Sequence, residues 1–222
     1  MAKEFMDVVI ILDKSGSMVD LTDDTIGGYN SLIEQQKKEN KDKDIYVSTY
    51  LFNTQVDTLC FAQPISKVEP LTREKYVACG GTALFDAIGD AVNQEDARIV
   101  KLARKGMKIP QKTLIVVTTD GYENSSKKYT NIELIRKLIQ QKKDEGVCFM
   151  FIGADIDSDS FAEKIGIGAD YAFSVERSSN GVRDMMNTVS CCMVTHPYDV
   201  EDNIREMSKS RRTANVKKQN NH

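Results

Sequence analysis

The sequence predicts an α/β fold built around a mostly parallel sheet. Apolar, β-branched runs alternate with segments of helical periodicity along the chain, which is typical of this class. The run over residues 113–118 is almost continuously apolar, as expected for a strand that helices cover on both faces. Two further runs are separated by Asn53-Thr54, which predicts a hairpin and therefore one antiparallel pair.

Strands are expected where short apolar runs are bounded by polar or glycine residues. The predicted strands cover residues 5–12, 45–52, 55–61, 113–118, 147–152 and 171–175. Helices are expected where apolar residues recur every three or four positions. The first predicted helix covers residues 24–39, and the second runs from Thr82 to about residue 103 and is ended by Gly106. A third lies between the capping box Thr130/Glu133 and Gly146, and a short fourth begins at the capping box Ser160/Glu163. The last predicted helix covers residues 182–194.

Length and composition indicate one domain with a tail. The 222 residues, 41% of them hydrophobic and 28% charged, are enough to bury a large core. We assign residues 1–196 to the domain and residues 197–222 to an extension, because His196-Pro197 interrupts the pattern. The extension is expected to form one or two amphipathic turns and then, from Lys209, a basic and disordered tail. Such a tail is more often a solvated terminus than a site for nucleic acid or an acidic partner.

Charge and cysteine content narrow the class of protein further. The net charge of −3 argues against a general affinity for nucleic acid. The five cysteines are odd in number and include no CxxC pair, so we expect a reducing, cytoplasmic environment. No N-terminal signal is visible, and no apolar run approaches the roughly 20 residues of a membrane span. The chain is therefore expected to be neither secreted nor membrane-anchored.

The stretch Asp13-Lys14-Ser15-Gly16-Ser17 carries the strongest functional signal. It places one carboxylate and two hydroxyls, each two residues apart, directly after the first predicted strand. Thr82 opens a predicted helix, and Asp120 follows the strand at 113–118. Because ligands of α/β sheets bind beyond the carboxyl ends of the strands, we expect these groups to converge. Hard oxygen donors of this kind suit Mg²⁺ better than zinc.

The set Asp13, Ser15, Ser17, Thr82 and Asp120 resembles the metal-ion-dependent adhesion site of von Willebrand factor type A domains. All five positions hold the expected residue type, and the resemblance covers about residues 5–194. It implies a three-layer, doubly wound, Rossmann-like sheet with one antiparallel edge strand. It also implies that Ser15 and Ser17 bind the metal directly and that Thr82 binds directly or through water. The two aspartates would hold metal-bound waters and orient the hydroxyls.

The resemblance implies an interaction module rather than an enzyme. Mg²⁺ is the expected ion, with Mn²⁺ and Ca²⁺ as alternatives. Neutral hydroxyl ligands leave such an ion electrophilic, and in this family an Asp or Glu of a partner protein commonly completes its coordination. We therefore expect Mg²⁺-dependent binding of a partner carboxylate, with Lys14 facing solvent. The rim of the site is expected to include Met18, Val19, Leu21, Tyr122, Glu123 and Asn124.

A Mg²⁺-dependent, phosphatase-like hydrolase on a related fold is the alternative. Haloacid-dehalogenase-like phosphatases also place an Asp after the first strand, but they normally carry a second Asp two residues later as acid and base. Ser15 occupies that position here, so the proton donor is missing. Taken singly, Ser15, Ser17 and Thr82 are also ordinary helix-cap residues. Only the complete set of five favours a metal site.

Overall fold

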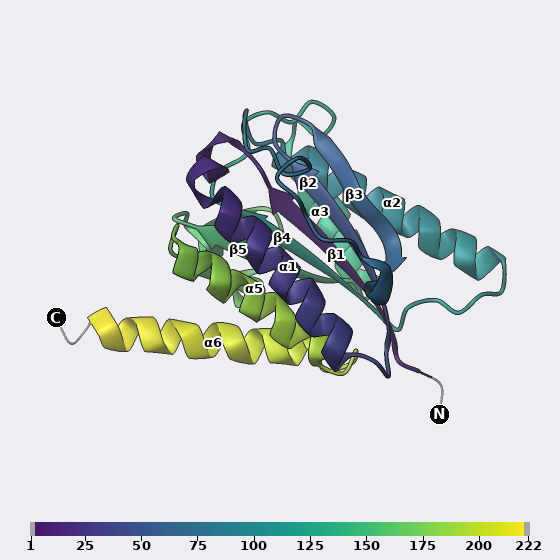
Figure 1. Cartoon of the computed structure of the whole chain (residues 1–222). Helices are drawn as coiled ribbons and strands as arrows, with labels where there is room; N and C mark the ends of the chain where they lie inside the picture. The colour runs from purple at the N-terminus through teal and green to yellow at the C-terminus, as the bar shows by residue number, and fades with distance from the viewer. Residues whose placement is uncertain (1–2, 220–222) are drawn as a thin grey trace.

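Helices pack on both faces of a six-stranded sheet in the computed structural model, which describes residues 3–219 (Figure 1). The strand order is β3-β2-β1-β4-β5-β6, and only β3, at one edge, runs antiparallel to its neighbour. This topology confirms the predicted fold class. The strands are β1 (Phe5–Asp13), β2 (Asp44–Phe52), β3 (Val56–Pro64), β4 (Lys112–Thr119), β5 (Cys148–Ala154) and β6 (Ala172–Val175).

The centre of the sheet determines where the candidate site lies. β1 pairs in parallel with β2 on one side and with β4 on the other. Leu12 lies opposite Thr118 in this register, so Asp13 ends its strand next to the end of β4. From β1 the chain adds β2 and β3 on one side of the sheet and then β4, β5 and β6 on the other side. Open α/β sheets bind ligands where the strand order reverses in this way, here between β1 and β4.

The antiparallel edge strand β3 is irregular. Its pairing with β2 shifts register on both sides of Thr49. At this irregularity Ala62 adopts a positive φ of 44°, a conformation that is uncommon for residues other than glycine. Its N–H donates a hydrogen bond to the hydroxyl of Ser48, a buried residue of β2, at 2.8 Å. A side chain therefore accepts a bond that the backbone of β2 would accept in a regular ladder.

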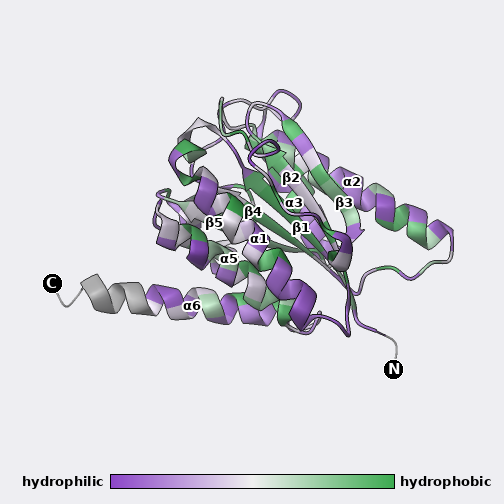
Figure 2. Ribbon diagram, viewed as in Figure 1, coloured by the Kyte–Doolittle hydropathy of each residue, from purple (hydrophilic) through white to green (hydrophobic). Residues whose placement is uncertain are grey.

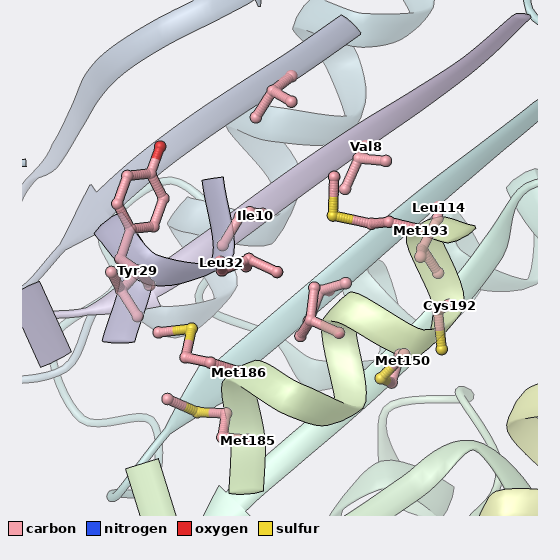
Figure 3. Packing of buried hydrophobic residues seen from close by; sticks show 14 of the residues in the cluster. Val8, Ile10, Tyr29, Leu32, Leu114, Met150, Met185, Met186, Cys192 and Met193 are labelled. Carbon is pink, nitrogen blue, oxygen red and sulfur yellow. The ribbon is translucent and has the colours of Figure 1, made fainter. Parts of the chain in front are cut away.

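Two hydrophobic cores lie on opposite faces of the sheet because side chains alternate along each strand. Val8 and Ile10 of β1 contribute to one core, and Val9 and Ile11 contribute to the other. Figure 3 shows Leu32 of α1 and Met186 of α5 in the first core, beside Ile10. The central strands are accordingly the most continuously apolar part of the fold (Figure 2).

Five helices cover the two faces within the described residues. α1 and α5 pack against each other on one face, while residues of α2, α3 and α4 line the core of the other face. The predicted capping boxes are wrong in detail: the side chain of Asn131 caps α3, and that of Asp157 caps α4, so Ser160 lies inside its helix. The helices are α1 (Thr22–Glu39), α2 (Leu84–Arg104), α3 (Ile132–Asp144), α4 (Ser158–Lys164) and α5 (Ser179–Val194).

A sixth helix, α6 (Val200–Gln219), follows α5. It is longer than the one or two turns expected from the sequence, and it continues past Lys209 in place of the expected disordered tail. Its first turns are held by buried apolar residues, and Ser208 donates a hydrogen bond to the carbonyl of Ala172 in β6 at 3.3 Å. Arg212 forms ion pairs with Asp159 and Asp170, so part of the predicted basic tail is paired with the domain. None of the helices within residues 3–219 has the length and apolar character needed to cross a membrane.

Candidate metal centre

Asp13 lies at the floor of the candidate site and is only 1% exposed. One carboxylate oxygen accepts a hydrogen bond from the N–H of Ser15, and the other accepts one from the Thr119 hydroxyl, both at 2.6 Å. Its backbone carbonyl accepts a third bond from the hydroxyl of Tyr76 at 2.5 Å. Burial raises the pKa of Asp13 to about 6 in spite of the hydrogen bonds to its carboxylate, which act in the opposite direction.

Ser15, Ser17 and Asp120 form a continuous chain of hydrogen bonds. The hydroxyl oxygens of the two serines are 3.0 Å apart, and Ser17 donates to Oδ1 of Asp120 at 2.6 Å. The serines lie on a tight turn at the start of a 3₁₀ helix, η1 (Gly16–Leu21). The N–H of Gly16 donates to the carbonyl of Gly80, and glycine suits this position because a Cβ there would lie only 3.2 Å from that oxygen. The glycine thus joins the serine turn to the loop that leads to Thr82.

Thr82 is positioned by the loop that follows Asp120. Its N–H donates to the side-chain carbonyl of Asn124 at 2.8 Å, and its own carbonyl accepts the N–H groups of Asn124 and Ser125. Glu123 accepts a bond from the N–H of Phe85 in the first turn of α2. A methyl group placed on Gly121 would lie 3.5 Å from the Thr82 hydroxyl, so this hydroxyl faces the residue next to Asp120. The fifth predicted residue therefore lies beside Gly121, the neighbour of Asp120.

The donor set fits a small, hard cation. It consists of three neutral hydroxyls and two carboxylates, brought together from the ends of β1 and β4 and from the start of α2. Within the described residues there is no group of three or more His, Cys, Asp or Glu side chains arranged to hold a metal. Because Mg²⁺ prefers oxygen ligands, a site rich in hydroxyls and without nitrogen or sulfur donors suits this ion.

Two predictions about the residues around the site are wrong. Lys14 does not face solvent: it is 8% exposed, and its ammonium group lies 2.7 Å from the carboxylate of Asp57 on β3. Met18 and Leu21 do not form the rim, because η1 turns both side chains into the core. Val19, by contrast, is exposed, as is Tyr122 after Asp120.

Three further residues, outside the predicted set of five, contact the candidate site. Thr119 and Tyr76 support Asp13 through their hydroxyls. Arg177, in the turn between β6 and α5, places its Nε 3.0 Å from Oδ2 of Asp120 and also donates to the carbonyl of Ser17. Thr119 precedes Asp120 directly and could have been noticed, whereas nothing in the sequence around Arg177 indicates that it reaches a site more than fifty residues away.

Solved structures of low sequence identity share this fold. The pilus adhesin SpaC from Lactobacillus rhamnosus GG matches 89% of this chain and 31% of its own with a TM-score of 0.64 at 11% identity. The von Willebrand factor domain of the pilus tip protein Mfa5 from Porphyromonas gingivalis matches 87% of this chain and 97% of its own, with a TM-score of 0.59 at 9% identity. The proximal thread matrix protein 1 of the mussel byssus has a TM-score of 0.57 at 17% identity over 86% of this chain.

The present chain spans about half of the mussel protein, since 47% of that protein is matched. Another structure of the mussel protein is described as having a zinc-occupied MIDAS motif, the abbreviation for the metal-ion-dependent adhesion site.

A comparison with curated proteins gives no match. A comparison with protein families matches residues 7–188 to the von Willebrand factor type A domain, in agreement with the strand order and the antiparallel edge strand. The chain therefore belongs to the von Willebrand factor type A domain family.

Proposed function

We propose that this protein binds Mg²⁺ through Asp13, Ser15, Ser17, Thr82 and Asp120 and uses the ion to capture a carboxylate of a partner protein. The observation that carries the proposal is the hydrogen-bond chain from Ser15 through Ser17 to Asp120, with Thr82 alongside. The resemblance to the metal-ion-dependent adhesion site implies ligand or supporting roles for the same five positions. Mn²⁺ and Ca²⁺ are alternative ions, and one structure of the mussel protein is described with zinc in its MIDAS motif.

The hydrogen bonds account for the role of each side chain. Ser17 gives its proton to Asp120, so its oxygen keeps lone pairs for a cation. Asp13 accepts bonds from Ser15 and Thr119 and thereby fixes the turn that presents both serines. A bound Mg²⁺ would supply an electrophile to which an outside carboxylate can bind, because hydroxyl ligands leave its charge largely uncompensated.

The surface around the site suits a protein partner. Val19 and Val77 are each 55% exposed, and Tyr122 is 51% exposed. All three belong to the loops that carry or support the five predicted ligands. Exposed apolar and aromatic side chains around a polar centre are common where a partner's anchor residue is buried. Membership of a family of interaction and adhesion modules supports the same conclusion and argues against the hydrolase alternative.

We also propose a cytoplasmic location and an independent domain over residues 1–196. All five cysteines are free thiols, and Cys79 and Cys191 are exposed, which suits a reducing compartment. The family match ends at residue 188, before α6 begins. Residues 197–222 would accordingly form an extension of the domain.

Calorimetric titration with Mg²⁺ tests the metal site. We expect Ser17→Ala and Thr82→Ala to weaken Mg²⁺ binding by about tenfold or more. Ser31→Ala, a matched change on the exposed side of α1, should leave the affinity unchanged. The absence of any Mg²⁺ binding by the wild-type protein would contradict the proposal.

A pulldown tests whether the protein captures a partner in a Mg²⁺-dependent manner. The wild-type protein serves as bait in a native lysate with Mg²⁺, in parallel with a sample containing EDTA and a sample with the Ser17→Ala variant. We expect a partner to be retained only by the wild-type protein with Mg²⁺, and a substitution of its Asp or Glu to abolish retention. A partner that is held equally well in EDTA would show that binding does not depend on the metal.

A further inference from the structure

Arg177 introduces a positive charge into the centre of the candidate metal site. Its Nε donates to Oδ2 of Asp120 at 3.0 Å, and its Nη2 donates to the backbone carbonyl of Ser17. The Arg177 side chain is 29% exposed, whereas that of Asp120 is fully buried. Each carboxylate oxygen of Asp120 is thereby engaged, one by Ser17 and the other by the guanidinium.

The backbone around Arg177 is fixed on both sides. The N–H of Arg177 donates to the carboxylate of Asp155 at 3.2 Å, and the N–H of Asp155 donates to the carbonyl of Val175. Asp155 adopts a positive φ of 53°, which is unfavourable for a residue with a side chain. On the other side, the hydroxyl of Ser178 caps α5 by accepting the N–H of Gly181. These contacts hold Arg177 at the mouth of the site.

The contact between Arg177 and Asp120 opposes the binding of a divalent cation. A guanidinium remains charged throughout the pH range in which proteins fold, so a metal ion would approach a site that already contains a cation. The guanidinium also neutralises the carboxylate of Asp120, whose negative charge would otherwise attract an ion bound by Ser15 and Ser17. Asp20, exposed and 3.9 Å from the guanidinium, offers Arg177 an alternative carboxylate when it leaves Asp120.

We propose that Arg177 sets the metal affinity of the site by competing with the divalent cation for Asp120. In the metal-free protein the guanidinium neutralises Asp120, and in the metal-bound protein it is displaced from that carboxylate. This inference rests on the proposed metal-binding function and adds a residue that the five-residue motif does not contain. The site would then retain Mg²⁺ less tightly than its oxygen ligands alone would allow.

Calorimetric titration with Mg²⁺ alone compares the wild type, Arg177→Gln and Arg183→Gln. Arg183 is an exposed residue of α5, so its substitution removes the same charge without touching Asp120. We expect Arg177→Gln to lower the Mg²⁺ dissociation constant about tenfold and Arg183→Gln to change it little. Equal or weaker binding by Arg177→Gln would overturn the competition while leaving the proposed function intact. If neither the wild type nor Arg177→Gln binds Mg²⁺, both proposals are wrong.

A second measurement follows Arg177 in the wild-type protein and does not depend on whether the variant folds. The Nε–H resonance of Arg177 in isotope-labelled protein should show a hydrogen-bonded, slowly exchanging proton in EDTA. Saturation with Mg²⁺ should shift this resonance and accelerate its exchange with water. A resonance that is unchanged at saturating Mg²⁺ would show that the guanidinium stays on Asp120, and would overturn the inference.

Discussion

Replacement of Asp13 by Asn should stabilise the metal-free protein while abolishing its response to Mg²⁺. Asp13 is almost completely buried, and burial raises its pKa from 3.8 to about 6. A group whose pKa is raised by folding stabilises the folded state at low pH and loses that contribution as the pH rises through the folded-state pKa. A shift of about two units corresponds to about 3 kcal/mol, which ionised Asp13 costs the fold at pH 8.

The surroundings of Asp13 can accept an amide in its place. The side-chain oxygen of Asn would accept the Ser15 N–H as the carboxylate does now. Its NH₂ group would donate to the Thr119 hydroxyl, which lies 2.9 Å from the carbonyl of Gly121 and can donate there instead. No buried polar atom loses its partner in this exchange, so the gain from removing the charge should be realised.

Denaturant unfolding in EDTA measures this effect. The free energy of unfolding of Asp13→Asn should exceed that of the wild type by up to about 3 kcal/mol at pH 8 and by about 1 kcal/mol at pH 4.5. Asp42→Asn, on an exposed turn, controls for the removal of one negative charge. Equal stability of Asp13→Asn and the wild type at pH 8 would refute the argument that burial of a charge at Asp13 destabilises the fold.

Further predictions concern the metal, a buried acid and a packed glycine. Mg²⁺ at about one hundred times its dissociation constant should stabilise the wild type by about 2.7 kcal/mol and should not stabilise Asp13→Asn. EDTA should reverse the stabilisation in a thermal unfolding assay. Burial raises the pKa of Glu95, which shares the guanidinium of Arg98 with Asp7, to about 7. The free energy of unfolding should therefore fall as the pH rises towards 8, and Glu95→Gln should reduce this pH dependence in denaturant unfolding. The same pH dependence in the variant would show that Glu95 does not cause it. Gly89→Ala should destabilise the protein by about 1–3 kcal/mol, because the added Cβ would lie 2.2 Å from the ring of Tyr129. Gly27→Ala, with no atom within 4 Å of its Cβ, should instead stabilise α1, and equal effects of the two changes would contradict the packing argument.

Parallel strand geometry made it predictable that Asp13 and Asp120 lie close together. Asp13 and Asp120 are far apart in the sequence, yet each directly follows an apolar run, and parallel neighbours end at the same edge of a sheet. The hydroxyl groups of Ser15 and Ser17 were also recognisable, because they follow Asp13 at intervals of two residues. This spacing can be read from the sequence without knowledge of tertiary contacts. The strand positions were predicted to within a few residues because buried strands appear in the sequence as apolar runs.

Side-chain directions outside regular elements were not predictable. Lys14 lies between predicted ligands that face the candidate site, but its partner Asp57 belongs to the edge strand β3. Only the pairing of β2 with β3 brings Lys14 and Asp57 together. Arg177 follows a short strand in an ordinary turn, and the loop geometry at Asp155 directs it to Asp120. The length of α6 also depends on tertiary contacts, because ion pairs of Arg212 compensate for its polar sequence. Local patterns do not encode any of these long-range contacts.

The irregular edge strand β3 limits how this protein can associate with others. A regular edge offers a row of free N–H and carbonyl groups onto which a strand of another molecule can add. The register shifts and the bent backbone at Ala62 interrupt this row, and Pro64 removes a further donor at the end of the strand. Strand addition at β3, and the fibril growth that can follow from it, are thereby disfavoured.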